Sequence, residues 1–149
     1  MATDTIITVE SANQRLTEVF APWIRQLNIQ VTEIGGDQVT LRLPYHDDLC
    51  RSGGLICGQA LMSLIDTCMV FVCYLGMGRY SDCATVSQHT TFMRPAIGVD
   101  VIATGKLVKS GRTLIFGEVT LTSDDDPRPV CNGSLTYAVQ RVSDLRSHQ

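Results

Sequence analysis

The chain has 149 residues, 44% of them hydrophobic, which suits one soluble domain over residues 1–149 with its core in about residues 29–142. The net charge of -3, with 12 basic and 15 acidic residues mixed along the chain, leaves no basic face for nucleic acid. Six cysteines stand in apolar runs without a close-spaced disulfide framework, and no signal peptide precedes them. We therefore expect reduced thiols and a cytoplasmic protein.

A helix and a hairpin are the first elements that the sequence predicts. Apolar residues recur at three- and four-residue spacing over residues 9–27, which indicates an amphipathic helix, with Pro22 as a kink or break. Apolar and polar residues then alternate over residues 29–43 on both sides of Gly35-Gly36-Asp37. This pattern is typical of a β-hairpin.

A very apolar helix is expected over residues 58–77, after an aperiodic loop at residues 45–56. The segment approaches membrane-spanning length, but Ser63, Asp66 and Thr67 interrupt it and Gly76-Met77-Gly78-Arg79 end it. These polar interruptions favour the core helix of a soluble protein and argue against membrane association.

Four long strands are expected after this helix, over residues 83–93, 99–108, 113–122 and 130–142, with turns between them and a frayed tail at residues 143–149. Short connections imply antiparallel neighbours. The order of elements predicts an α+β fold, in which an antiparallel sheet wraps around the apolar helix. Since one short chain cannot cover that helix on every side, we expect a homodimer.

The apolar helix carries one polar stripe, formed by Gln59, Ser63 and Asp66 or Thr67 at steps of three or four residues. An unpaired carboxylate among buried residues is costly, so Asp66 must be compensated or used. One hypothesis makes it a general base or nucleophile. The alternative is that Ser63 and Thr67 bond back to helix carbonyls while strand amides hold Asp66.

The start of the same helix offers a second chemical group. The free amides of Gly58 and Gln59 lie at the positive end of the helix dipole, where they form a candidate oxyanion hole. Gly58 and Asp66 are separated by about 12 Å of helical rise at 1.5 Å per residue, too far to act on one carbonyl within a chain. If both are catalytic, they meet across a dimer interface.

The chain resembles the hotdog-fold acyl-CoA thioesterases, in particular the PaaI-like branch typified by phenylacetyl-CoA thioesterase. The resemblance runs over about residues 43–139 and is carried by residues 53–67, 85–96 and 111–114. In the family, a catalytic acid follows the histidine of His-Gly-Gly by nine residues, and here Asp66 follows Cys57 by nine. The resemblance implies a hotdog fold, an acyl-CoA thioester as substrate, no further cofactor, and dimers that often pair into dimers of dimers.

The resemblance also implies roles for individual residues. Asp66 would activate water or attack the thioester, Thr85 would orient that carboxylate, and the Gly58 and Gln59 amides would polarise the carbonyl. Substrate contacts fall to one further set of residues: Arg51, Cys57, Ser63, Arg94, Lys109 and Arg112. The basic residues of the last two turns suit the phosphates of CoA, although basic turn residues are also commonly just solvated.

This chain departs from the family at the helix start, where Cys57-Gly58-Gln59 replaces His-Gly-Gly. The Gln59 amide keeps its N–H, and its side chain is placed to narrow the acyl pocket or to bind substrate. Cys57 with His89 as base is an alternative nucleophile, although apolar cysteines are usually inert. His46 beside Asp47 and Asp48 lacks a second histidine at ligand spacing, so we expect no metal.

Three functions remain open on the sequence. Hydrolysis of an aryl or a short- to medium-chain acyl-CoA is favoured by Asp66 and the helix-terminal amides. A hydratase or dehydratase of the same fold needs a histidine close to the acid, which position 57 does not supply. A non-catalytic acyl-CoA binding protein is the third alternative. Nothing in the sequence fixes the acyl group.

Overall fold

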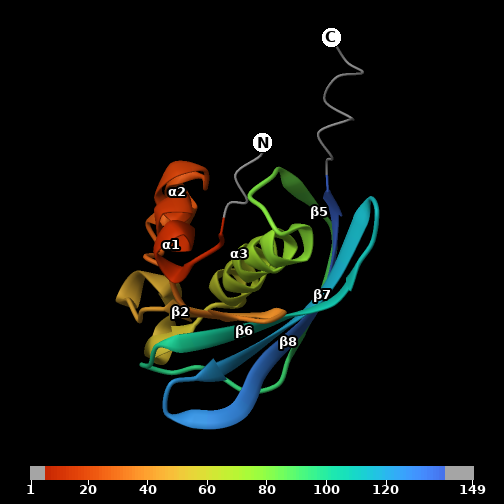
Figure 1. Ribbon diagram of the computed structural model, residues 1–149. Coiled ribbons are helices and arrows are strands. Elements are labelled where there is room, and N and C mark those ends of the chain that lie inside the picture. The colour runs from red at the N-terminus through yellow and green to blue at the C-terminus, as the bar shows by residue number, and fades with distance from the viewer. Residues whose placement is uncertain (1–5, 140–149) are drawn as a thin grey trace.

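The computed structural model describes residues 6–139, in which six strands form one antiparallel sheet in the order β1-β2-β6-β7-β8-β5 (Figure 1). The expected end of the last strand at residue 142 and the tail at 143–149 lie outside these residues. The strands run over the following ranges: β1 (Gln30–Gly35), β2 (Gln38–Leu43), β5 (Cys83–Phe92), β6 (Val101–Ser110), β7 (Leu114–Ser123) and β8 (Asp126–Val139).

The central helix α3 (Gly58–Met77) has the bounds that the sequence predicts, and the sheet curves around it (Figure 1). It ends at Gly78, whose left-handed conformation (φ 68°) lets its N–H bond to the last-turn carbonyls. The helix is long and apolar enough to cross a membrane, but 61% of its most apolar window is buried inside the fold. It is therefore the core helix of a soluble α+β domain.

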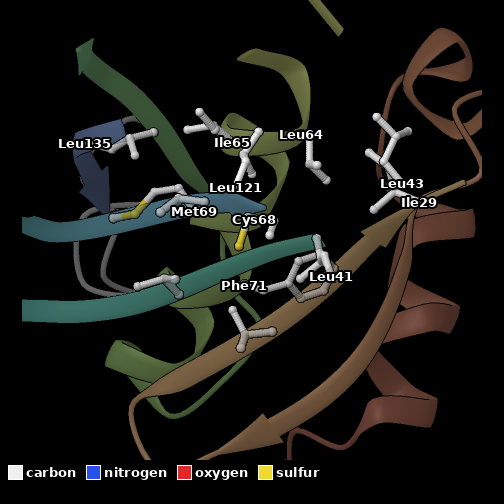
Figure 2. Packing of buried hydrophobic residues seen from close by; sticks show 14 of the residues in the cluster. Ile29, Leu41, Leu43, Leu64, Ile65, Cys68, Met69, Phe71, Leu121 and Leu135 are labelled. Atoms are coloured by element: carbon white, nitrogen blue, oxygen red, sulfur yellow. The ribbon is translucent and has the colours of Figure 1, made fainter. Parts of the chain in front are cut away.

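The inward face of α3 packs directly on the sheet. Ile65, Cys68 and Met69 are fully buried there and lie against the strands (Figure 2). Burial of this kind stabilises a fold by about 25 cal/mol for each Å² of apolar surface removed from water. The same desolvation raises the pKa of the Cys68 thiol, so this cysteine serves as a small apolar packing residue.

Three glycines on neighbouring strands let α3 approach the sheet closely. A Cβ on Gly105 of β6 would lie 2.7 Å from Cys68 Sγ, and one on Gly117 of β7 would lie 2.5 Å from Met69 Sδ. A Cβ on Gly133 of β8 would lie 2.8 Å from Ile65 Cγ2. No side chain fits at these distances, so the glycines set the depth at which α3 is seated.

The N-terminal segment forms two helices, α1 (Val9–Glu18) and α2 (Pro22–Arg25), where the sequence predicts one helix with a break at Pro22. The break is confirmed, because α2 starts at Pro22, where proline needs no N–H partner. The side chain of Thr8 caps α1 by accepting a hydrogen bond from the Ser11 amide. The two helices lie beside α3, outside the sheet (Figure 1).

Two expected irregular segments contain more order than the sequence indicates. Within residues 45–56, the strands β3 (Cys50–Arg51) and β4 (Leu55–Ile56) pair, next to short 3-10 turns at Asp47–Leu49 and Ser52–Gly54. Strand β8 begins at Asp126, inside the turn expected at residues 123–127. It starts early because Asp126 pairs with Ser123 of β7, with register shifts that accommodate the neighbouring prolines.

Candidate active site

Asp66 lies half-buried in the middle of α3 with two hydroxyl groups on one carboxylate oxygen. Thr85 Oγ1 donates to Asp66 Oδ1 at 2.9 Å, and the Tyr137 hydroxyl donates to the same oxygen at 2.5 Å. The Tyr137 oxygen also lies 2.9 Å from the backbone carbonyl oxygen of Asp66. Among the described residues, hydroxyl groups and not strand amides therefore compensate this carboxylate.

Strand pairing brings the two donors together, since Thr85 on β5 stands directly opposite Tyr137 on β8. A β-bulge follows at once, between Thr85 and Ser87, as bulges often do beside active sites. Tyr137 is only 2% exposed. Its desolvation, and then its bond to Asp66, raise the pKa of the phenol, so Tyr137 stays protonated and acts as a donor.

Tyr137 is not among the site residues that the sequence predicts, and Thr85 is predicted through the family resemblance alone. The available signal was the alternation along β8, which puts Tyr137 on the same face as buried residues such as Leu135. A buried tyrosine needs a partner for its hydroxyl. That partner lies 71 positions away in the sequence, and only the assembled sheet identifies it.

A cavity of about 330 Å³ opens beside the Asp66 carboxylate. Its floor comes from α3 and from the start of β5, and Tyr137 closes one side. Its outer wall comes from the segment that joins α1 to α2 and from α2 itself. The wall residues are apolar: Val19, Phe20, Ala21, Trp23 and Ile24.

The N-terminus of α3 faces a different cavity, of about 380 Å³, lined by Arg51, Gly58, Phe92 and Arg94 among others. Cys57 precedes the helix in an extended conformation (φ -70°, ψ 152°), and its side chain makes no capping bond. Within residues 6–139, the Gly58 and Gln59 amides have no hydrogen-bond acceptor. They are free to receive a ligand oxygen.

The two cavities share no lining residue. The carboxylate of Asp66 and the amide of Gly58 therefore belong to separate sites in one chain, as the helical spacing predicts. Gln59 is exposed, and Cys57 is half-buried at the helix start.

The other residues predicted to contact substrate lie within α3 and near both of its ends. Ser63 Oγ donates to the Gln59 carbonyl at 2.8 Å, the backbone-bonded alternative, and also lines the Asp66 cavity. Arg94 donates to the Pro129 carbonyl at 2.9 Å. Lys109 and Arg112 lie around the β6–β7 turn, where Ser110 bonds the Gly76 carbonyl near the C-terminal end of α3. One chain thus carries these two cations at the opposite end of α3 from Arg51 and Arg94.

The residues considered for metal binding and those considered for thiol chemistry lie apart in the described part of the sequence. His46 Nδ1 accepts a hydrogen bond from the Asp48 amide, and His89 lies exposed on β5. Among residues 6–139, no group of three or more histidine, cysteine or acidic side chains is placed to hold a metal ion. All six cysteines are free thiols.

Comparisons with known proteins identify the family. The family model of the "Thioesterase superfamily" matches residues 53–130. A "putative esterase" from Halobacterium salinarum is 28% identical over 125 residues, which are 77% of this chain and 82% of that protein. A "putative thioesterase" from Silicibacter sp. TM1040 has a similar structure, with a TM-score of 0.82 and 26% identity over 91% of this chain and 94% of that one. A thioesterase from Haemophilus influenzae reaches a TM-score of 0.85 at 18% identity, over 100% of both chains.

The chain belongs to the thioesterase superfamily. Its curved antiparallel sheet around one long helix is the hotdog fold, as the sequence predicts. Family membership assigns it to the thioester hydrolases.

Proposed function

We propose that the protein hydrolyses acyl-CoA thioesters, with Asp66 as general base or nucleophile. The observation that carries this proposal is the held carboxylate: two hydroxyl donors fix Oδ1 of Asp66 at the edge of a cavity large enough for an acyl group. A carboxylate held in this way is preorganised for proton transfer or attack. Membership of the thioesterase superfamily supplies the reaction class.

The reaction follows from these groups. As a base, Asp66 takes a proton from the water that attacks the carbonyl carbon, and the amides of Gly58 and Gln59 receive the negative carbonyl oxygen. The carbon–sulfur bond then breaks, and the proton passes to the CoA thiolate to give the free thiol and a carboxylic acid. As a nucleophile, Asp66 attacks the carbonyl carbon and forms an anhydride as the carbon–sulfur bond breaks and CoA leaves as the thiolate. Water then hydrolyses the anhydride, which releases the carboxylic acid, restores Asp66 and supplies the proton for the thiolate.

The active unit in this proposal is a dimer joined along β5. This strand ends the sheet, and large apolar side chains remain open on and beside it: Val86 is 58% exposed and Phe92 is 49% exposed. Exposed apolar edge strands invite pairing with another chain. A two-fold axis at this edge sets the α3 helices side by side and antiparallel, so that Asp66 meets the amide of the partner subunit's Gly58.

The substrate's two ends are assigned to the two cavities. Arg51 and Arg94 line the cavity at the Gly58 amide and suit the phosphates of CoA. Lys109 and Arg112 form a second proposed set of contacts to the CoA phosphates. Cys57 and Ser63 are the proposed contacts to the acyl group. The apolar wall that includes Phe20 and Trp23 suits an aryl or a short- to medium-chain acyl group, in keeping with the PaaI-like branch.

We also propose a reducing compartment, the cytoplasm. Six free cysteines in a fold with buried thiols support this location, because oxidising compartments favour disulfides. Burial raises the pKa of Cys131 to about 12, which keeps this thiol protonated and unreactive.

Thiol release from a panel of aryl and aliphatic acyl-CoAs tests the function, with wild type and Asp66→Asn side by side. Asparagine keeps an oxygen for the Thr85 and Tyr137 hydroxyls but cannot accept a proton. We expect kcat to fall about 100- to 10,000-fold while CoA ester binding is retained. Turnover by Asp66→Asn at the wild-type rate would contradict the proposal, and so would a wild type that binds acyl-CoA without hydrolysing any member of the panel.

A further inference from the structure

We infer that Tyr137 is a positioning residue that selects which oxygen of Asp66 performs the chemistry. This inference rests on the proposed function of Asp66. Both hydroxyl donors, Thr85 Oγ1 and the Tyr137 phenol, reach Oδ1. From residues 6–139, no hydrogen bond reaches Oδ2. The second oxygen therefore keeps its lone pairs for water or for the thioester carbon.

The phenol of Tyr137 bridges the side chain and the main chain of Asp66. Its oxygen lies 2.5 Å from Asp66 Oδ1 and 2.9 Å from the Asp66 carbonyl oxygen. A phenol carries one proton, so the two acceptors share it. The bridge ties the carboxylate to its own helical turn and fixes the rotamer of Asp66, which a single bond from Thr85 leaves free to rotate.

The support of Tyr137 is itself rigid. The residue lies on β8 between two paired strands, opposite Thr85 on β5 and opposite Ile115 on β7. Its ring is almost fully buried, so the hydroxyl has little freedom to move away from Asp66. A site residue held by an immobile neighbour keeps its reactive geometry between turnovers.

The test compares Tyr137→Phe with Tyr80→Phe. Each variant loses a phenol hydroxyl and keeps its ring. The Tyr80 hydroxyl lies 2.6 Å from Ser11 Oγ, and neither residue lines the Asp66 cavity. We expect Tyr137→Phe to lower kcat about 10- to 100-fold with little change in KM. Tyr80→Phe is expected to keep the wild-type kcat and KM.

A second readout decides the inference without activity. Carbon-13 NMR of aspartate carboxylates, with the Asp66 signal assigned from Asp66→Asn, reports on the surroundings of this one carboxylate. We expect its chemical shift at fixed pH to differ between Tyr137→Phe and wild type, because the carboxylate loses the phenol donor, and to stay unchanged in Tyr80→Phe. An unmoved Asp66 signal in Tyr137→Phe, together with wild-type kcat, would overturn the role of Tyr137. A moved signal in a protein that hydrolyses no acyl-CoA would support the positioning contact while the proposed function fails.

Discussion

The two edge strands of the sheet, β1 and β5, differ in whether another part of the chain bonds to their outer backbone. At the β1 edge, the Asn13 side chain of α1 occupies the outer backbone of Val31: Nδ2 donates to the Val31 carbonyl at 2.9 Å, and Oδ1 accepts from the Val31 amide at 2.9 Å. At the β5 edge, no other strand of residues 6–139 pairs with the outer backbone, and apolar side chains are exposed.

This difference separates stability from function. At the β1 edge, the side-chain amide of Asn13 takes the place of a neighbouring strand at Val31, so another chain cannot pair with the backbone of Val31. The open β5 edge carries Thr85 and borders both cavities, through Phe92 at the Gly58 cavity and Thr85 at the Asp66 cavity. We therefore expect changes at the β5 edge to alter assembly and catalysis, and changes at the β1 edge to alter stability alone.

The largest effect is expected from Val86→Glu on β5. A charge on the pairing edge separates the subunits, and activity falls by about 1,000-fold or more because each site loses its partner's amides. Val108→Glu is the matched control, since Val108 is similarly exposed (61%) but lies on β6. Sedimentation velocity and thiol release measure both. A monomeric Val86→Glu with wild-type kcat would contradict the shared site.

The next effect is expected from Gly58→Pro, which removes one oxyanion donor. Proline suits the first helical position, and the preceding residue, Cys57, has the extended ψ of 152° that proline requires. We expect kcat to fall about 100-fold. Gly58→Ala is the control, because it places the same Cβ 3.4 Å from the Phe92 ring and keeps the N–H. Equal kcat in the two variants would remove Gly58 from the oxyanion hole.

At the β1 edge, Asn13→Ala is expected to lower stability and to leave activity unchanged. The variant leaves the half-buried Val31 amide and carbonyl without their partner, which lowers the free energy of unfolding by about 1–3 kcal/mol. Gln14→Ala, which loses a surface bond to Glu18, should stay within about 0.5 kcal/mol of wild type. Urea unfolding measures both, and a loss of kcat in folded Asn13→Ala would break the division between the edges.

The smallest effect concerns Asp100, which ties the chain after β2 to β6. The Tyr45 amide at 2.7 Å, and then Arg42 at 2.9 Å, lower the pKa of this carboxyl below its ordinary 3.8. Its stabilisation is complete above the unfolded-state pKa and is lost as pH falls through the lower folded-state pKa. Since Asp100 is partly exposed, we expect less than about 1 kcal/mol. Unfolding curves for Asp100→Asn should converge with wild type at low pH, and parallel curves would contradict this.

Periodicity and composition in the sequence predict much of the fold. The bounds of α3, the hairpin of β1 and β2, and the break at Pro22 are confirmed, because each depends on residues close together in the chain. The same holds for the distance between Gly58 and Asp66, which helical geometry sets.

Contacts between distant segments are what the sequence does not predict. In the sequence, Gly105, Gly117 and Gly133 only interrupt three predicted strands. Their role in the close packing of α3 is evident only in the folded chain. The hydroxyl of Tyr137 finds its acceptor only after β8 pairs with β5. Which strands end the sheet also depends on the order of pairing, and that order decides which edge is open.

A subunit-mixing experiment tests the shared site most directly. Asp66→Asn and Gly58→Pro proteins are exchanged at equal concentration, mixed dimers are confirmed by differential tags, and thiol release is measured. Half of the dimers are then mixed, and each mixed dimer has one site with both groups intact, so the account predicts recovery to about a quarter of wild-type activity. Mixed dimers as inactive as the two parent variants would place both groups of a site in one subunit and contradict it.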